Sequence, residues 1–223
     1  MRTFDEIFTI AADRKGGIEA LEGMLSRPMS PEKVAAQPDD RWLSAMAKSI
    51  FQAGFNWKVI DAKWDGFETA FHGFDPVRVA HYHDEDMDRL ISDKGIVRNG
   101  PKIAAVMDNA RYVVDLAAEH GGMGRFVADW PGTEFIGLLD HLKKNGARLG
   151  GNTGQRMLRV MGKDGFMLSR DVTARLIAEG VVDKVPSSKR DMAAVQDAFN
   201  IWAEQSGRSL TEISRVLAFS VGS

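Results

Sequence analysis

Three blocks of sequence between Ala53 and Arg111 decide the fold: AGFNW at 53–57, AFHGFDPVRVA at 70–80 and GIVRNGPKIAAVMDNAR at 95–111. In two of the blocks a proline directly follows a small or polar residue, at Asp75-Pro76 and at Gly100-Pro101. Proline suits the first position of a helix, because its missing N–H would have no partner there. The blocks therefore predict helices that begin near these prolines and are separated by short turns.

Apolar residues also recur with a helical period outside the blocks. Further helices are expected over 4–11, 18–24, 42–51, 57–71, 84–91, 134–144, 155–161, 172–179 and 191–205. Ser30-Pro31 predicts another helix start, Asp39 or Asp40 is expected to cap the helix that contains 42–51, and Ser209 to Glu212 has the residues of a capping box. Alternating strand patterns are rare and no long internal repeat occurs, so the sequence predicts an all-α fold of about a dozen helices.

The composition limits the class of protein. The chain has 223 residues, of which 44% are hydrophobic and 27% are charged, and its net charge is −2. The length fits one domain or two small lobes. The net charge excludes a surface that is basic throughout, but it does not exclude a local basic face. The absence of cysteine excludes disulfides and thiolate metal sites. Because we find no long apolar run and no export signal, we expect a cytoplasmic protein without a membrane segment.

The three blocks, in this order and at this spacing, resemble the 3-methyladenine DNA glycosylase I family of base-excision repair enzymes. The resemblance implies an all-α, two-lobed helix-hairpin-helix fold. One lobe would comprise residues 1–48 and 183–223 and the other 49–182, with a cleft between them and a hairpin near 145–162. It implies hydrolysis of the N-glycosidic bond of flipped alkylated purines such as 3-methyladenine. The expected partner is double-stranded DNA containing damaged bases, and we expect a monomer without a cofactor.

A glycine-rich turn from Leu149 to Gly154 lies between two expected helices and is the candidate hairpin. Backbone N–H groups at such a turn bind phosphate without using side chains. The expected DNA contacts are Gly151, Thr153, Gly154, Arg148, Arg156 and Lys102. An ordinary glycine turn is the alternative, because Thr153 stands where the usual hairpin has a glycine. A second register would place the hairpin and its second helix over 166–179, with Ser169 replacing the glycine, but glycine at the phosphate favours the first register.

Asp171 is the candidate catalytic residue. In the wider helix-hairpin-helix superfamily an aspartate follows the hairpin and stabilises positive charge on the sugar or orients water. The alternative is a helix N-cap, since Ser169-Arg-Asp-Val172 is a capping sequence in its own right. Gln155 stands where bifunctional relatives carry a lysine, and an amide cannot form a Schiff base. The resemblance therefore implies a monofunctional enzyme.

The expected base-binding residues are Trp57, Phe55 and Ser49. Trp57 matches the family's pocket tryptophan, and its indole face would attract a cationic alkylated purine more than a neutral base. Core packing is the alternative for these aromatic residues, and we expect it for Phe51. Ser49 stands four residues before Ala53, where the family has a glutamate that contacts the damaged base, and serine cannot supply its charge. This substitution favours the runner-up function, a DNA lesion binder of the same fold without turnover.

Two further expectations concern the ends of the chain and the alternatives to DNA binding. The family holds a structural zinc through cysteines and histidines at its termini, and without cysteine the resemblance implies that this metal site is lost. We expect the N-terminal helices and residues 191–221 to pack the ends together instead. A helical interaction module unrelated to DNA stays as a third hypothesis, and salt-dependent duplex binding would separate it from the other two.

Overall fold

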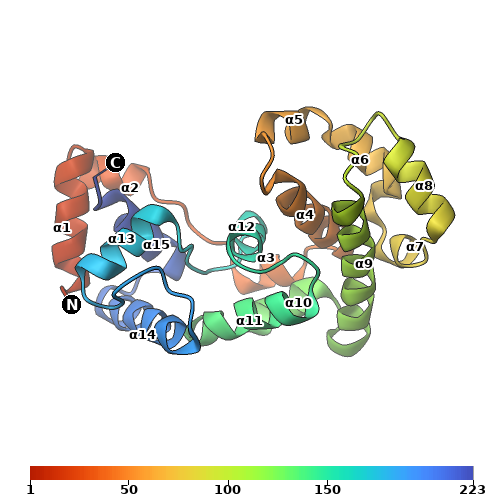
Figure 1. The fold of residues 1–223 in the computed structure, drawn as a ribbon. Helices are drawn as coiled ribbons and strands as arrows, with labels where there is room; N and C mark the ends of the chain where they lie inside the picture. The colour runs from red at the N-terminus through yellow and green to blue at the C-terminus, as the bar shows by residue number, and fades with distance from the viewer. Residues whose placement is uncertain (223) are drawn as a thin grey trace. The chain divides into compact units, whose positions relative to one another are not determined.

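The computed structural model describes residues 1–222, which form helices joined by turns and contain no strand (Figure 1). This confirms the all-α prediction. The chain divides into two compact units, of which unit 1 comprises Met1–Met29, Pro131–Gly137 and Asp164–Ser223, and unit 2 comprises Ser30–Trp130 and Leu138–Lys163. No helix in the described part of the chain combines the length and the apolarity that crossing a bilayer requires.

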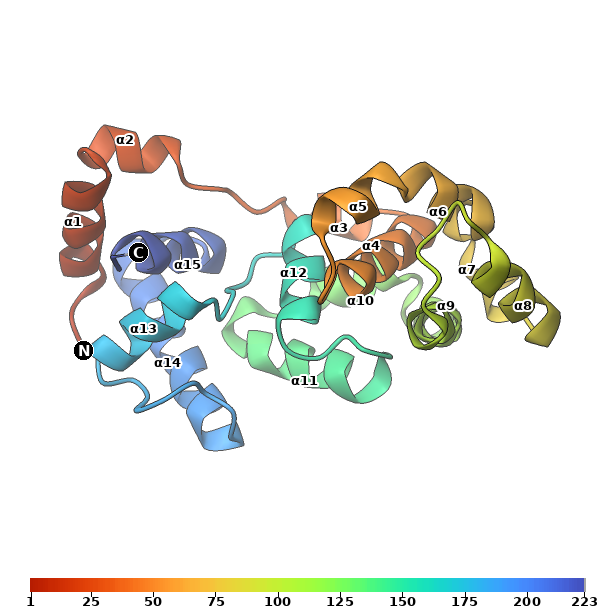
Figure 2. The same ribbon diagram turned by 45° about the horizontal axis from the view of Figure 1, so that its top comes forward.

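Unit 2 holds the three sequence blocks. Its helices are α3 (Pro31–Ala35), α4 (Asp39–Gln52), α5 (Trp57–Ala62), α6 (Trp64–Ala70), α7 (Pro76–Ala80), α8 (Asp84–Ser92), α9 (Gly100–His120), α10 (Met123–Asp129), α12 (Asn152–Val160) and most of α11 (Phe135–Asn145), with a 3-10 turn at His72–Phe74. The long helix α9 packs against α4 and α7, and α12 packs against α4 (Figure 2). Phe51 is fully buried and its ring meets Phe67 at 4.6 Å, so its predicted core position is confirmed.

Unit 1 brings the two ends of the chain together. Its helices are α1 (Phe4–Lys15), α2 (Ile18–Gly23), α13 (Arg170–Ala178), α14 (Lys189–Ser206) and α15 (Leu210–Phe219), with a 3-10 turn at Gly132–Glu134. Helix α1 packs against α14 and α15. The buried Trp202 of α14 donates its indole N–H to the carbonyl of Arg2 at 3.1 Å. The expected packing of the chain ends is therefore confirmed.

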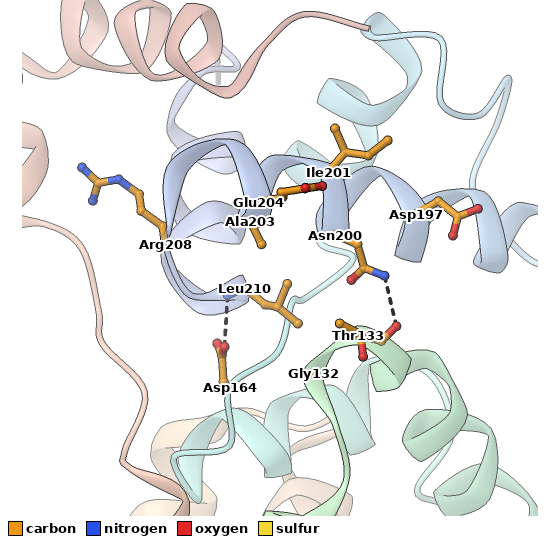
Figure 3. A pocket seen from close by; sticks show the side chains of 10 residues that line it. All are labelled: Gly132, Thr133, Asp164, Asp197, Asn200, Ile201, Ala203, Glu204, Arg208 and Leu210. Carbon is orange, nitrogen blue, oxygen red and sulfur yellow. Dashed lines mark hydrogen bonds between the residues drawn. The ribbon is translucent and has the colours of Figure 1, made fainter.

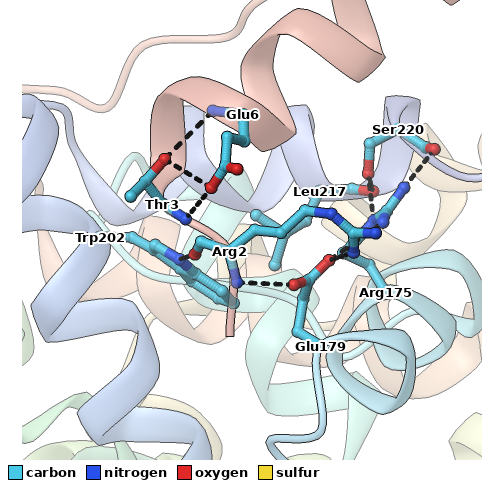
Figure 4. A network of polar contacts seen from close by, with 8 residues as sticks. All are labelled: Arg2, Thr3, Glu6, Arg175, Glu179, Trp202, Leu217 and Ser220. Carbon is cyan, nitrogen blue, oxygen red and sulfur yellow. Dashed lines mark hydrogen bonds and ion pairs between the residues drawn. The ribbon is translucent and has the colours of Figure 1, made fainter.

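A charged network fastens the N-terminus to α13 and to the end of α15 (Figure 4). Glu179 is buried, and its carboxylate accepts hydrogen bonds from the Arg2 backbone N–H and guanidinium, both at 2.8 Å, and from Arg175 at 3.1 Å. Arg175 is also buried and donates to the hydroxyl and carbonyl of Ser220. Because each buried charge meets an opposite charge or an acceptor, the network holds three distant segments in one place.

The local cap predictions hold where the signal is local and fail where the partner is distant. The side chains of Ser30, Asp75 and Ser209 cap α3, α7 and α15 as the sequence predicts. Asp39 or Asp40 was expected to cap α4, but Pro38 occupies that position. The carboxylate of Asp39 instead accepts from the N–H of Met123 at 2.7 Å, at the first residue of α10.

Two boundary differences matter for the site. The helix expected over 57–71 is two helices, because the chain leaves helical geometry at Lys63. The expected lobes began at residues 49 and 183, whereas the compact units change at Ser30 and Asp164. The difference arises because α3 and α4 pack against α10 and α9, and because α13 packs against α15. Ser223, the last residue of the expected first lobe, lies outside the described residues.

Candidate DNA-binding hairpin and base site

The turn between α11 and α12 leaves backbone amides free. Helix α12 begins after Gly151, which has φ +58° and offers no side-chain cap. A Cβ added to Gly151 would have no heavy atom within 4 Å, and Gly151 and Asn152 are exposed. The first amides of a helix lack intrahelical partners and carry partial positive charge. The start of α12 can therefore bind an anion through its backbone amides.

Gly154 has a different role from Gly151. It is buried in the first turn of α12, and a Cβ there would overlap the carbonyl oxygen of Leu149. Glycine at 154 therefore allows the carbonyl of Leu149, in the preceding turn, to lie against the first turn of α12. Thr153, where the usual hairpin has glycine, is half-buried and fits its helical position. Residues 146–151 thus form a turn between α11 and α12 within the range where the hairpin was predicted, and α12 accommodates Thr153.

We expect Gly154→Ala to destabilise the protein by about 1–3 kcal/mol, because the added methyl group meets backbone and not a flexible side chain. Thermal unfolding followed by circular dichroism measures this loss. Gly132→Ala is the matched control, since a Cβ there meets only Leu210 Cδ1 at an ordinary 3.5 Å. Equal stability of the two variants would show that the turn does not need the close approach.

Asn109 clamps the hairpin and was missed by the sequence analysis. Its side chain is fully buried in α9, and its amide donates to the carbonyl of Ala147 and accepts from the N–H of Ala147, both at 2.9 Å. The only sequence signal was its place in the block at 95–111, because the partner lies 38 residues away. This pair fixes the backbone next to Arg148.

Exposed cations surround the turn. Arg148 is exposed, has φ +58° and makes no ion pair within residues 1–222. A non-glycine residue in this conformation costs roughly 1–2 kcal/mol, a strain that proteins tend to retain at functional positions. Lys143 and Lys144, in the last turn of α11, are exposed as well. Together with the free amides, these side chains make a positive surface around Gly151.

Trp57 begins α5 beside the hairpin helix α12. It is 47% exposed, and its indole N–H donates to the carbonyl of Gln52 at 3.1 Å. The guanidinium of Arg156 lies over the indole, 3.3 Å from the ring centroid. The structure thus joins two predicted site residues that are far apart in sequence. It also places a cation where the sequence predicted a cationic purine, so a base that stacks on this face must displace Arg156.

Lys102 has a different place from the one expected for a phosphate contact. It is only 7% exposed, and its ammonium donates to the carbonyls of Phe51 at 3.1 Å and Ala53 at 2.6 Å. Burial, with the charge of Arg148, lowers the pKa of Lys102. Its charge therefore satisfies the carboxyl end of α4 and orders the AGFNW turn. The ammonium also lies 4.4 Å from the ring centroid of Phe55, whose side chain is exposed.

Ser49 is buried on α4, three residues before the last residue of the helix, Gln52. It supplies no negative charge to this region, whereas Lys102, Arg148 and Arg156 supply positive charge. The electrostatics around Trp57 therefore differ from those of a pocket that contains a glutamate.

Asp171 lies in unit 1, in the first turn of α13. The cap of this helix is Ser169, whose hydroxyl accepts from the N–H of Val172 at 3.2 Å. The N-cap alternative for Asp171 is therefore wrong. The half-buried carboxylate makes no hydrogen bond or ion pair within residues 1–222, so it is available for a ligand.

The connection between α12 and α13 bears on the second hairpin register. Residues 163–169 have no regular helix, and α12 and α13 belong to different units. A helix-hairpin-helix needs two helices joined by a tight turn. Residues 146–151 join α11 to α12 by turns and bends, whereas the longer irregular segment 161–169 separates α12 from α13. Gln155, buried in α12, keeps the position discussed for the lysine of bifunctional enzymes.

The chain does not offer the donor set of the family's zinc. It has no cysteine, and residues 1–222 contain no group of three or more His, Asp or Glu side chains that could hold a metal ion. A structural zinc needs four close ligands, usually with thiolates. The charged network around Glu179 and the packing of α1 hold the chain ends in this protein.

A cavity of about 820 Å³ lies in unit 1, and none of the predicted site residues lines it (Figure 3). Asp164, Asp197 and Glu204 line it, and its one cation, Arg208, is paired with Glu22. This lining repels phosphate, so the hairpin in unit 2 is the better candidate for nucleic acid.

Comparisons with known proteins identify a family and a fold for this chain. The methyladenine glycosylase family model matches residues 34–183. The DNA-3-methyladenine glycosylase 1 of Escherichia coli (strain K12) is 45% identical over 65 residues, which are 29% of this chain and 35% of that protein. The chain thus matches about a third of the length of this curated relative.

Two solved structures are similar in fold. The 3-methyladenine DNA glycosylase I of Staphylococcus aureus gives a TM-score of 0.50 at 23% identity, over 62% of this chain and 80% of that chain. The 8-oxoguanine glycosylase/lyase of Methanocaldococcus jannaschii, solved with DNA containing 8-oxoguanine, gives 0.52 at 12% identity over 96% of both chains. These likenesses confirm the helix-hairpin-helix glycosylase fold. Because the family model matches most of this chain, residues 34–183, the chain belongs to the methyladenine glycosylase family.

Proposed function

We propose that this protein is a monofunctional DNA glycosylase that hydrolyses the N-glycosidic bond of alkylated purines, such as 3-methyladenine, in double-stranded DNA. The observation that carries the proposal is the match of the family model to residues 34–183 together with an uncapped, exposed and positively flanked hairpin at Gly151. Free amides at a helix start and unpaired cations are the groups that hold a DNA backbone.

The proposed reaction assigns one role to each group. The amides near Gly151 and the side chain of Arg148 bind phosphate. The target nucleotide rotates out of the stack, at a cost of a few kcal/mol that is smaller for a damaged pair. Its base stacks on Trp57. As the bond to the base breaks, positive charge develops on the sugar, and the carboxylate of Asp171 stabilises it.

Two substitutions shape the proposal. Cationic alkylated bases leave easily, so the reaction tolerates a serine at 49 in place of the family's glutamate. Gln155 has no amine, so no imine with the sugar can form. The products are then a free base and an abasic site in an intact strand.

The test is an assay on methylated duplex DNA that measures the released bases by chromatography and the strand on a denaturing gel. We expect free 3-methyladenine and an uncut strand, and no protein–DNA adduct after borohydride treatment. A borohydride-trapped adduct would contradict the monofunctional assignment. Absence of base release with duplex binding intact would contradict glycosylase activity.

The second candidate function is a lesion binder without turnover, and Ser49 and Arg156 favour it. Ser49 lacks the negative charge of the family's glutamate, and Arg156 covers the indole face of Trp57. Both candidates require duplex affinity that falls steeply with salt, because phosphate contacts release counterions. Absence of duplex binding at low salt would dispose of both.

Arg156→Ala should change two affinities in opposite directions. A guanidinium over an indole contributes about 0.5–2 kcal/mol, which a stacking base must overcome. We therefore expect free 3-methyladenine to bind the variant roughly 2- to 30-fold more tightly, and duplex DNA to bind it more weakly. Isothermal titration calorimetry measures both affinities. Adding Trp57→Ala should abolish the gain, and an unchanged free-base affinity in Arg156→Ala would show that the base does not use this face.

A further inference from the structure

A polar cleft of about 360 Å³ lies between α9 and α11 in unit 2 and contains none of the residues assigned above to DNA. Helix α9 contributes Tyr112 and a row of carboxylates, and α11 contributes His141. The carboxylates are those of Asp108, Asp115 and Glu119. Their spacing places them on one face of α9 over three turns.

Two neutral polar atoms at this cleft are buried without a partner. Tyr112 is only 8% exposed, and neither its hydroxyl nor Nε2 of His141 has a hydrogen bond within residues 1–222. The rings are 6.0 Å apart. Burial raises the pKa of Tyr112 well above its ordinary value, and burial, with nearby His120 and Lys144, lowers the pKa of His141. Buried polar groups are nearly always paired, and leaving one unpaired costs roughly 1–3 kcal/mol.

The charge of the cleft is negative. Arg111, its one cationic lining residue, is held by Asp108 at 2.9 Å and by the carbonyl of Ala80 at 3.2 Å. Asp115 makes no hydrogen bond or ion pair in the described residues, and the side chain of Glu119 is largely exposed. A metal ion does not fit, because no group of three metal-binding side chains occurs in residues 1–222. The cleft therefore offers acceptors to a cation that carries its own N–H donors.

We propose that this cleft binds a linear aliphatic diamine or polyamine. One terminal ammonium would donate to the Tyr112 hydroxyl and to His141 Nε2, and a second ammonium would pair with Asp115 and Glu119. An alkylammonium has three donors and no acceptor, which matches an acceptor-rich site. Aromatic rings also attract such cations. Asp115 and Glu119 are one helical turn apart, so both reach the same ammonium. This inference does not depend on the proposed glycosylase function.

The test titrates 1,4-diaminobutane into the full chain at low ionic strength by calorimetry. n-Butylamine, which has one ammonium, and 1,4-butanediol, which has none, are the ligand controls. We expect saturable binding of the diamine, weaker binding of the monoamine and none of the diol. Tyr112→Phe and Asp115→Asn should each weaken diamine binding about tenfold, because each removes one bond to a charged group. Asp197→Asn, which removes an exposed carboxylate in unit 1, should leave the affinity unchanged.

Tyr112→Phe gives a second readout that a merely structural hydroxyl would not give. Because the hydroxyl has no protein partner, its removal should leave the melting temperature of the ligand-free protein unchanged or raise it. A large fall in melting temperature would show that the hydroxyl has a structural partner and would overturn the proposal. Unsaturable diamine binding, or an equal loss in Asp197→Asn, would overturn it as general attraction to an acidic surface.

Discussion

Asp171→Asn should lower the single-turnover rate of base release by about 100- to 1,000-fold while duplex affinity is kept. The substitution preserves shape and removes the negative charge, so it leaves nothing to oppose the positive charge that develops on the sugar. The helix should not suffer, because Ser169 and not Asp171 caps α13. Affinity for undamaged duplex should stay equal or rise, since a carboxylate contributes only repulsion towards phosphate.

The control for this prediction is Asp183→Asn, which removes an exposed carboxylate from the same unit as Asp171. We expect its rate to equal that of wild type. Equal rates of Asp171→Asn and wild type would show that another group performs the chemistry. A loss of rate that comes with a loss of duplex affinity would show that Asp171 acts on binding and not on the bond-breaking step.

Glu179→Gln should have the largest effect on stability. Removing one charge from a buried pair leaves the other uncompensated, which costs about 3–5 kcal/mol. Arg175 would keep its bonds to Ser220 but lose its counter-ion, and Arg2 would lose its charged acceptor. For a chain of this size we expect the melting temperature to fall by roughly 6–20 °C. Glu204→Gln, an exposed carboxylate of α14, is the control and should melt like wild type.

The same network predicts the direction of the pH dependence. Burial raises the pKa of Glu179, but the hydrogen bonds from Arg2 and Arg175 outweigh burial and the pKa lies below its ordinary value. A carboxyl group with a lowered pKa stabilises the fold above its unfolded pKa, about 4.3, and loses this contribution as pH falls through the folded pKa. The stability gap between wild type and Glu179→Gln should therefore be full at pH 6–7 and shrink below about pH 4. A gap that does not change with pH would contradict an ionised Glu179.

Local sequence signals predicted most of the fold. Caps such as Ser30, Asp75 and Ser209 act within one helical turn, so reading the sequence was enough to place them. The short helix α10 was missed because it is only seven residues long and its first N–H is capped by Asp39, 84 residues earlier. The lobe boundaries expected from the sequence also differ from those of the compact units, because packing between helices that are distant in the chain decides where a unit ends.

The sequence named candidate site residues but could not predict the contacts that they make. The hairpin glycines, Trp57 and Asp171 carry a pattern that a family resemblance can read. No pattern could show that Arg156 lies on Trp57, that Lys102 turns inward to Ala53, or that Asn109 clamps the hairpin, because each partner is far away in the chain. The contact of Arg156 with Trp57 places a positive charge on the indole face where a cationic base was expected.

Single-turnover release of radiolabelled base from methylated duplex DNA, with the protein in excess, tests most directly whether this fold still performs excision. A measurable first-order release of methylated adenine by wild type, absent from protein-free controls, is the result that the proposed function predicts. Duplex that is fully bound in a salt-dependent manner and yet keeps its methylated bases over the same time would contradict it, and would leave a lesion-binding protein built on a glycosylase scaffold.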